Sequence, residues 1–464
     1  MQQVVVEGVS QSAARFVSEL RFQDIPAPAV ARFKLCLLDA IGCATFATTT
    51  PWGRILSDYV VEQGGIEGGS VWGTGRSVPP AMAALVNGTL VHSFELDDLH
   101  KSSILHPSGV VVPAALALAE ARGGVSGEAL IAASIAGFEV GIRAGLSVGT
   151  SHLVKGYHPT GTNGAPAAAA AAANLLGLAP REAEHAIGIA ATQSAGLMAA
   201  QFESMVKRMH AGRAAQAGVV GAELAARGFT GIDHVFEAEY GGYCATLSDE
   251  PKPALIADGL GSRFETEKVG FKIYSCCGSC HTSVEAIRRL RERHAVTPGM
   301  VERIDVDTTT ATYLHVGWPY EPRSITAAQM NMPYCVAATM IDGEAFVEQF
   351  TAQRIHDPEI IDLAGRVSAQ PAEDLDALGP SGRHRVRVRL HLTDGTVLAE
   401  EVGHAKGSDA DPLTDDEVVE KYFRLVEPVA GPAWARAVFE IVTTLDTQDS
   451  TTALSALLAR PHIH

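Results

Sequence analysis

Three successive segments that are apolar on nearly every side constrain the fold of this chain most strongly. They follow His106-Pro107 and read VVVPAALALAEA, GEALIAASIAGFEVGIRAGLS and APAAAAAAANLLGL. A helix at a protein surface keeps a polar face, so such helices are expected inside a large bundle. Apolar residues at helical spacing also run from Pro26 to Ala47, onward from Pro79, and over residues 181–230. The first two-thirds of the chain is therefore predicted to be helical.

The sequence pattern changes near residue 265, where strands join the helices. Asp394-Gly395 connects two alternating runs in HRVRVRLHLTDGTVLAEEV, which is a strong hairpin signal. Together with its neighbours this hairpin forms an α+β unit of average domain size. After Pro412 an amphipathic helix is predicted to pack back on the helical part. The other segments expected in the α+β unit are strands over 271–274 and 302–313 and helices over 281–294, 332–343 and 356–367.

The formal net charge of −17 argues against a nucleic-acid partner. An acidic protein that handles an acidic substrate needs a local basic pocket. Seven cysteines, an odd number with Cys276 next to Cys277, do not resemble a secreted disulfide framework. The N-terminal residues lack the basic start and apolar core of an export signal, and no uninterrupted apolar run reaches membrane-spanning length. We therefore expect a cytoplasmic protein with no membrane partner.

The stretch HSFELDDLHKSSILHPSG, from His92 to Gly109, is the first candidate site. It places three histidines, three carboxylates and Lys101 in an apolar neighbourhood, where ionisable groups are costly unless they line a cleft. Its carboxylates, Glu95, Asp97 and Asp98, could order water or substrate hydroxyls, and His106 could move protons near neutral pH. The alternative is that Asp97 and Asp98 cap a helix and that His100 is solvated.

The second candidate is GYHPTGTNGAP, an irregular loop around His158 that leads into a long apolar helix. The N–H groups near Thr160, at the helix N-terminus, are suited to hold a carboxylate. The alternative is a structural histidine.

The third candidate is KRMHAGRAAQAG, in which Lys207, His210 and Arg213 follow one another at intervals of three and share a helix flank. This cationic flank could neutralise a polyanionic small molecule. The alternative, a solvated face, is less favoured because residues 214–220 carry no other charge.

The fourth candidate is CCGSCH, from Cys276 to His281. Cys277, Cys280 and His281 match the pattern for covalent haem attachment, and thiolates with a histidine could also bind zinc. No second Cys/His pair completes a metal site, and haem attachment requires export. The simplest interpretation is a turn that presents His281 over small buried cysteines.

Taken together, these motifs resemble the MmgE/PrpD family, which includes 2-methylcitrate dehydratase, cis-aconitate decarboxylase and iminodisuccinate epimerase. The resemblance covers nearly the whole chain. It rests on LLDAIG near Asp39, VNGTLVHSFELDDLH leading to HPSG, GYHPTGTNGA, KRMHAGRAAQAG with ARGFTG, and DPLTDDEV.

The resemblance implies a mainly α fold that works as a homodimer without a cofactor. A large all-helical domain would comprise residues 1–265 together with 408–464, and a smaller α+β lid domain would comprise residues 266–407. The family's decarboxylases and dehydratases carry a D-F-D-D-T motif where this chain has Glu95-Leu96-Asp97-Asp98-Leu99. The first carboxylate is thus longer here and the final hydroxyl is missing, while His100 and Lys101 look particular to this chain.

The resemblance also implies a set of site residues and no metal. The expected substrate is a small di- or tricarboxylic acid, from which a proton next to a carboxylate is removed. His106 or His158 would act as the base, with the other histidine or Tyr313 as the acid, while Lys207 and Arg208 hold carboxylates. The expected catalytic residues are His106, His158, Lys207, Asp97 and Tyr313, and the expected substrate-binding residues are Glu95, Asp98, Lys101, Thr160, Arg208, His210 and His281.

Three functions remain open from the sequence. A lyase, either a dehydratase or a decarboxylase of a citrate- or aconitate-like acid, is preferred because it is the commoner family chemistry. An epimerase of a dicarboxylic acid such as iminodisuccinate would use the same site. A non-catalytic binder, or a haem or metal carrier using Cys277, Cys280 and His281, is the alternative outside enzymology.

Overall fold

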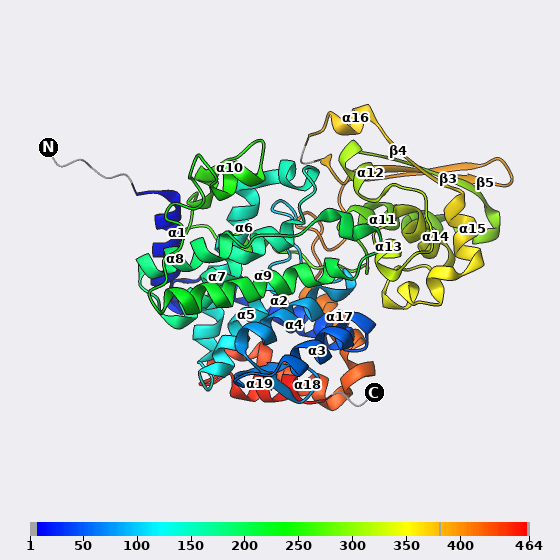
Figure 1. Cartoon of the computed structure of the whole chain (residues 1–464). Helices are drawn as coiled ribbons and strands as arrows, with labels where there is room; N and C mark the ends of the chain where they lie inside the picture. Colours follow the sequence, from blue (N-terminus) through cyan, green and yellow to red (C-terminus); the bar gives the residue numbers. More distant parts are fainter. Residues whose placement is uncertain (1–6, 380–381, 462–464) are drawn as a thin grey trace.

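The computed structural model describes residues 7–379 and 382–461, and within them the fold is mainly α, as predicted (Figure 1). Residues 1–6, part of the N-terminal segment considered for export, lie outside the described residues. The helices of the large body are α1 (Val9–Glu19), α2 (Ala27–Ala47), α3 (Pro51–Gln63), α4 (Pro80–Val91), α5 (Pro107–Ala121), α6 (Gly127–Val154), α7 (Pro159–Leu176), α8 (Pro180–Ala191), α9 (Val206–Ala225) and α10 (Tyr243–Leu247).

Helices α5, α6 and α7 form the interior of this body, as their apolar sequences predict. By length and composition alone α6 could cross a membrane, yet 89% of its apolar window is buried inside the protein. It packs between α5 and α7. Its two central charged residues, Glu139 and Arg143, form an ion pair one turn apart. In this structure α6 is thus a core helix of the bundle.

Helix α9 lies unusually close to α4 and α7 because it carries glycine at the contacts. A Cβ atom at Gly212 would stand 2.0 Å from the carbonyl oxygen of Leu85 on α4, and one at Gly218 would stand 2.3 Å from the Cβ of Ala168 on α7. Any larger residue would push α9 outward. This close approach positions the first turn of α9, which carries Lys207, against the loop that follows α4.

The C-terminal helices return to the body, as the sequence predicts. They are α17 (Asp415–Ala430), α18 (Pro432–Thr443) and α19 (Thr452–Ala459). Helix α17 packs along α2, and α19 contacts α5. Figure 1 shows these orange and red helices beside the blue α2, α3 and α4. The two ends of the described chain therefore share one body.

The remaining segments form a smaller α+β lobe, drawn in green and yellow on the other side of Figure 1. Its sheet has the order β4-β3-β5-β6, with β3 and β4 parallel and the other pairs antiparallel. Helices α11 and α14 pack on the sheet. The strands are β3 (Val301–Thr308), β4 (Val367–Pro371), β5 (Val386–Leu392) and β6 (Val397–Val402), and the helices are α11 (His281–His294), α12 (Thr310–Val316), α13 (Ile325–Gln329), α14 (Met332–Asp342), α15 (Pro358–Gly365) and α16 (Glu373–Asp376).

The hairpin at Asp394-Gly395 is confirmed. Gly395 has a φ of 85°, and its N–H donates to the carbonyl oxygen of Leu392. Burial alternates along β5, as the sequence pattern predicts.

Three expectations about secondary structure were wrong. The strand expected over 302–313 ends at Thr308, and residues 310–313 belong to helix α12. The other two concern residues 271–274 and the helical body. Residues 271–274 do not form a strand; they lie in an irregular loop that follows a single bridge between Leu99 and Gly270. The body is not wholly helical, because β1 (Gly69–Val71) and β2 (Arg76–Val78) form a small hairpin. In both places the local sequence is too short for its periodicity to decide between strand and loop.

Candidate active site

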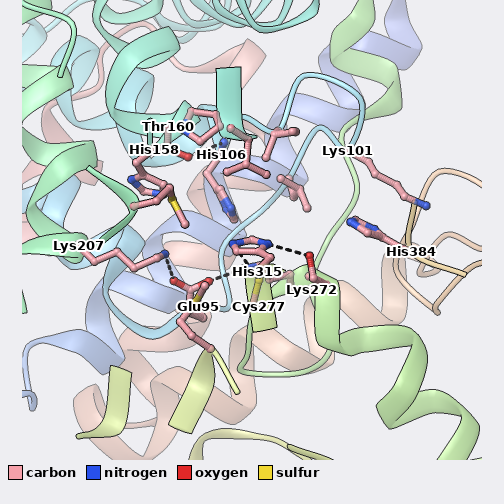
Figure 2. Close-up of a pocket in the computed structure, with 18 of the residues that line it drawn as sticks. Glu95, Lys101, His106, His158, Thr160, Lys207, Lys272, Cys277, His315 and His384 are labelled. Atoms are coloured by element: carbon pink, nitrogen blue, oxygen red, sulfur yellow. Dashed lines mark hydrogen bonds and ion pairs between the residues drawn. The ribbon is translucent and has the colours of Figure 1, made fainter. Parts of the chain in front are cut away.

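A cavity lies where the helical body meets the α+β lobe. Figure 2 shows Lys207 and Glu95 on one side of it and Lys101 with His384 on the other. The lining comes from both parts of the fold. It comprises Glu95, Leu99, Lys101, Ile104, His106, Leu153, His158, Pro159, Thr160, Met198, Lys207 and Lys272, followed by Cys277, Gly278, Ser279, His315, Met330, Arg383 and His384.

The carboxylate of Glu95 forms ion pairs with three cationic side chains. Its Oε1 accepts hydrogen bonds from Lys207 and Arg208, and its Oε2 lies 3.2 Å from the Nζ of Lys272. Burial alone would raise the pKa of Glu95, but Lys207, Lys272 and Arg208 outweigh it and hold the pKa well below the usual range. Glu95 is therefore ionised.

The backbone at Glu95 is held in a strained conformation. Its φ is 55°, in the left-handed region that residues other than glycine rarely adopt. Such a conformation persists only where the surroundings impose it. The ion pairs with α9 and with the loop at Lys272 provide that restraint. Glu95 therefore positions these cations rather than leaving its own carboxylate free for substrate.

Asp97 supports two histidines at once. One carboxylate oxygen lies 2.8 Å from Nδ1 of His92, and the other lies 3.2 Å from Nδ1 of His106. Burial opposes ionisation of Asp97, but His106 and His92 together hold its pKa well below the usual range. Burial lowers the pKa of His92 to about 4. With Nδ1 of His106 against Asp97, its other ring nitrogen is the one left for a molecule in the cavity.

His158 contacts His210 across the cavity wall, with 3.0 Å between their Nδ1 atoms. Burial, with Lys207 nearby, lowers the pKa of His158 well below its usual value, and burial lowers that of His210 to about 4. Both rings are therefore neutral near pH 7. The histidines therefore lie in two different surroundings. His158 and His210 form a neutral pair, whereas the ring of His106 contacts the carboxylate of Asp97.

Thr160 lies at the cavity, but the helix N-terminus beside it is largely used within the protein. The N–H groups of Gly161 and Thr162 donate to the carbonyl oxygen of His158. The hydroxyl of Thr160 accepts from the backbone N–H of His106 at 3.4 Å. The expectation that these N–H groups hold a substrate carboxylate therefore applies at most to Thr160 itself.

Asp98 lies outside the cavity lining, and the capping interpretation of this residue is correct. Its carboxyl group accepts from the backbone N–H of Ser108 at 3.3 Å and from the Ser108 hydroxyl at 2.7 Å, at the start of α5. Burial, with Asp39 and Asp97 nearby, raises the pKa of Asp98 well above the usual range. The pKa values of the neighbouring carboxyl groups at 97 and 98 are thus moved in opposite directions.

Five more predicted site residues do not line the cavity. Asp97 and His210 lie behind His106 and His158, which they contact, and the others are Arg208, Tyr313 and His281. Arg208 is fully buried behind Glu95, where it also donates to Oε1 of Gln329 at 2.6 Å. Tyr313 lies on α12 but outside the lining; His315, two residues on, faces the cavity and contacts the hydroxyl of Ser279 at 3.0 Å. His281 lies in an adjoining hollow, where Nε2 is 3.2 Å from the carbonyl oxygen of Cys276.

The residues of the third candidate motif do not all lie at the cavity. Lys207 is buried at the cavity, which excludes the solvated-face alternative for this residue. Arg213 is exposed and contacts Gln216, so it does not share the site. His100, which the alternative interpretation took to be solvated, is buried with its Nε2 3.6 Å from Glu265.

Five titratable lining residues were not predicted as site residues for this reaction: Lys272, Cys277, His315, Arg383 and His384. Cys277 was considered as a haem or metal ligand and as a small buried cysteine. Lys272 lay in a segment expected to be a strand. The lobe residues carry no local signal, because only the tertiary fold brings them to the body.

A haem or zinc site at Cys277, Cys280 and His281 is not favoured by the structure. All three residues are buried, and Cys280 faces Cys276 and Cys335 instead of an open surface. In the part of the chain that the structure describes, the group of side chains whose ligand atoms converge is His92, Asp97 and His106. His92 is hydrogen-bonded to Asp97 at 2.8 Å, and Nδ1 of His106 lies 3.2 Å from the other carboxylate oxygen, so Asp97 contacts both rings directly.

A helical body whose cationic, histidine-rich cavity is covered by an α+β lobe defines an enzyme for a small acidic molecule. Residues 11–255 match the MmgE/PrpD N-terminal domain, and residues 274–447 match the MmgE/PrpD C-terminal domain. The chain belongs to the MmgE/PrpD family, as the motifs predicted.

Several relatives match over nearly their whole length. The cis-aconitate decarboxylase-like protein oryM of Aspergillus oryzae is 34% identical over 97% of each chain. Cis-aconitate decarboxylase of Aspergillus terreus is 34% identical, covering 98% of this chain and 96% of the relative. The Homo sapiens cis-aconitate decarboxylase is 26% identical, with 99% and 96% covered. The prediction of an MmgE/PrpD-type lyase is confirmed, and the epimerase alternative is not favoured.

Proposed function

We propose that this protein decarboxylates a small unsaturated tricarboxylic acid of the cis-aconitate type. The observation that carries the proposal is the cavity itself, which combines a surplus of cations with an imidazole supported by Asp97. Full-length similarity to relatives named as cis-aconitate decarboxylases supports the choice of substrate.

The chemistry of such a substrate sets clear demands on the site. In cis-aconitate the carboxylate on the CH₂ group is β,γ to a carbon–carbon double bond. When the bond to this carboxylate breaks, CO₂ leaves, a new double bond forms at the CH₂ carbon, and the far carbon of the old double bond takes up one proton. The product is methylenesuccinate. Negative charge spreads onto a conjugated carboxylate during the reaction, so the site must offer fixed cations and one proton donor.

Lys207 and Lys272 are the cations we assign to that carboxylate. Both are buried, and both are held in place by Glu95. Water is therefore largely excluded, which strengthens their attraction for a developing charge.

His106 is the group we assign to proton delivery. Asp97 fixes its Nδ1 and stabilises a positive ring, so the opposite nitrogen can donate a proton to carbon and recover it from water. His158, held neutral by burial, would orient the substrate through a hydrogen bond.

Proton NMR in deuterated water tests this function. With cis-aconitate we expect CO₂ release and methylenesuccinate carrying one solvent deuterium at the saturated CH₂. His106→Gln and Lys207→Gln should each lower kcat by about 100-fold or more. Deuterium exchange without CO₂ release would contradict the decarboxylase and favour the epimerase.

Two further expectations, the homodimer and the cytoplasmic location, stay predictions. We propose the homodimer because several large apolar side chains near the cavity are exposed in the single chain, among them Leu197, Phe202 and Met205. Light scattering of the purified protein tests it, and a monomer at micromolar concentration would contradict it.

A further inference from the structure

A second cationic group lies at the end of the cavity away from Lys207, and the reaction proposed above does not use it. Arg383 and His384 come from the short segment before β5, and Lys101 comes from the loop after Asp98. Figure 2 shows Lys101 and His384 together on the side opposite Lys207 and Glu95. Arg383 and Lys101 are close enough to His384 for their charges to lower its pKa.

Arg383 is a guanidinium without a partner among the residues that the structure describes. No carboxylate lies within 4 Å of it, and its Nε is buried without a hydrogen bond. The Nε2 of His384 is likewise buried and unbonded. Arg208, on the other side of the cavity, also has a buried Nε without a hydrogen bond, but its terminal nitrogens donate to Glu95 and Gln329. Arg383 as a whole is half-buried, and its Nε is the guanidinium nitrogen that is fully shielded without a hydrogen bond. A guanidinium beside a cavity with no acidic partner is suited to bind an anionic ligand.

The charges of the cavity lining indicate what that ligand carries. Four cationic side chains, Lys101, Lys207, Lys272 and Arg383, face one carboxylate, Glu95. The histidines at 158, 315 and 384 have lowered pKa values and add no charge near pH 7, and the charge of a positive His106 is offset by Asp97 behind it. The surplus of three positive charges matches a tricarboxylate and exceeds what a dicarboxylate would neutralise.

We propose that Arg383, with Lys101 and His384 beside it, binds a third carboxylate of the substrate and makes the enzyme selective for tricarboxylic over dicarboxylic acids. The inference rests on the proposed function only in taking the ligand to be a small polycarboxylic acid. Arg383 supplies two parallel N–H donors for a carboxylate, which Lys101 cannot do. Lys101 adds charge at the same end, where the exposed Asp409 is the acid nearest to it.

The selectivity is measured with two unreactive ligands that differ by one carboxylate. Propane-1,2,3-tricarboxylate has the skeleton of the proposed substrate, and methylsuccinate is the same molecule with one terminal carboxylate replaced by hydrogen. Calorimetry gives the affinity of the wild-type protein and of each variant for both ligands. We expect Arg383→Gln to lower the affinity for the tricarboxylate by about 10- to 100-fold and to keep the affinity for methylsuccinate within about threefold of the wild type. The reason is that a hydrogen-bonded charge is lost for only one of the two ligands.

Arg385→Gln is the matched control, because Arg385 lies two residues on, pairs with Glu401 at 2.8 Å and does not line the cavity. It should bind both ligands as the wild type does. Arg383→Lys keeps the charge but loses the two parallel N–H donors. Its affinity for the tricarboxylate should therefore lie between those of the wild type and Arg383→Gln. If Arg383→Gln does not fold, Lys101→Gln replaces it, with an expected loss of about threefold or more for the tricarboxylate alone.

Equal weakening of both ligands by Arg383→Gln, or no weakening of either, would overturn the inference. These binding results do not depend on turnover. If the wild-type protein prefers the tricarboxylate through Arg383 but releases no CO₂ from cis-aconitate, the proposed reaction fails and the carboxylate site stands. If CO₂ is released but the preference for the tricarboxylate is absent, the proposed reaction stands and the carboxylate site at Arg383 fails.

Discussion

Lys421 on α17 and Asp39 on α2 form a buried ion pair, with 2.6 Å between Nζ and Oδ1. The same ammonium donates to the carbonyl oxygen of Leu96 at 2.5 Å, between Glu95 and Asp97. The C-terminal helices are therefore fastened both to the body and to the loop that carries the candidate site.

Lys421→Met should destabilise the protein by about 3–5 kcal/mol, because it leaves Asp39 buried without its partner. Chemical denaturation of the variant measures this loss. Kcat should fall as well, since the carbonyl of Leu96 loses its donor.

Lys155→Met is the control, because it breaks an ion pair of the same length that is exposed instead of buried. Lys155 lies 2.6 Å from Asp249, the same separation, but the side chains are 30% and 70% exposed. An exposed pair contributes at most about 1 kcal/mol. Equal losses in the two variants would show that burial of the Lys421 pair is not what stabilises the fold.

Asp97→Asn should lower kcat by about 100-fold or more, because an amide cannot stabilise a positive His106 ring. Asp98→Asn, the neighbouring change, should retain most of the activity. Asp98 contacts Ser108 at the start of α5 and lies outside the cavity lining, and its raised pKa shows that its surroundings disfavour the charged form, so an uncharged amide is tolerated there. Steady-state kinetics on the two variants checks the contrast, and similar losses would refute the separate roles of the two carboxyl groups.

Much of the fold was predictable because it follows from periodicity. The apolar helices α5 and α7 and the hairpin at Gly395 each carry their signal within one short segment. Tyr313 was expected from the resemblance and not from periodicity. Residues two apart on a helix point in nearly opposite directions, so His315 lines the cavity and Tyr313 does not.

The candidate site was predictable where body residues bring their own polar motif, as at His106, His158 and Lys207. It was not predictable for Lys272 and Arg383, which reach the cavity only when the lobe docks on the body. The role of Glu95 was also hidden, because its carboxylate is occupied by cations that lie more than 100 residues away in sequence.

The stability of the protein should fall as the pH drops from 6.5 toward 4. Burial lowers the pKa of His152 to about 4, where its ring contacts the Thr162 hydroxyl at 2.6 Å and the Leu247 carbonyl at 3.0 Å. Because the unfolded chain binds the proton more readily, this stabilisation is complete above pH 6.5 and is lost on acidification. His152 contributes at most about 3 kcal/mol to the change.

Thermal unfolding across this pH range measures the effect. His152→Gln should reduce the pH dependence, whereas His294→Gln, at the exposed end of α11, should leave it unchanged. A variant at 152 with the full wild-type pH dependence would contradict the assignment.

Glu95→Gln should destabilise the empty protein and increase the stabilisation that a bound polyanion provides. The change leaves Lys207, Arg208 and Lys272 without their shared carboxylate, at a cost of about 3–5 kcal/mol. An added tricarboxylate would then neutralise cations that Glu95 neutralises in the wild type, so propane-1,2,3-tricarboxylate should raise the Tm of Glu95→Gln by more than that of the wild type. Glu265→Gln is the matched control, because Glu265 also contacts Arg263 and Lys268 but does not line the cavity. Glu265→Gln should lose stability, but the ligand should raise its Tm no more than it raises that of the wild type. A larger ligand-induced rise in Tm for Glu265→Gln than for Glu95→Gln would show that the cations around Glu95 do not face the substrate.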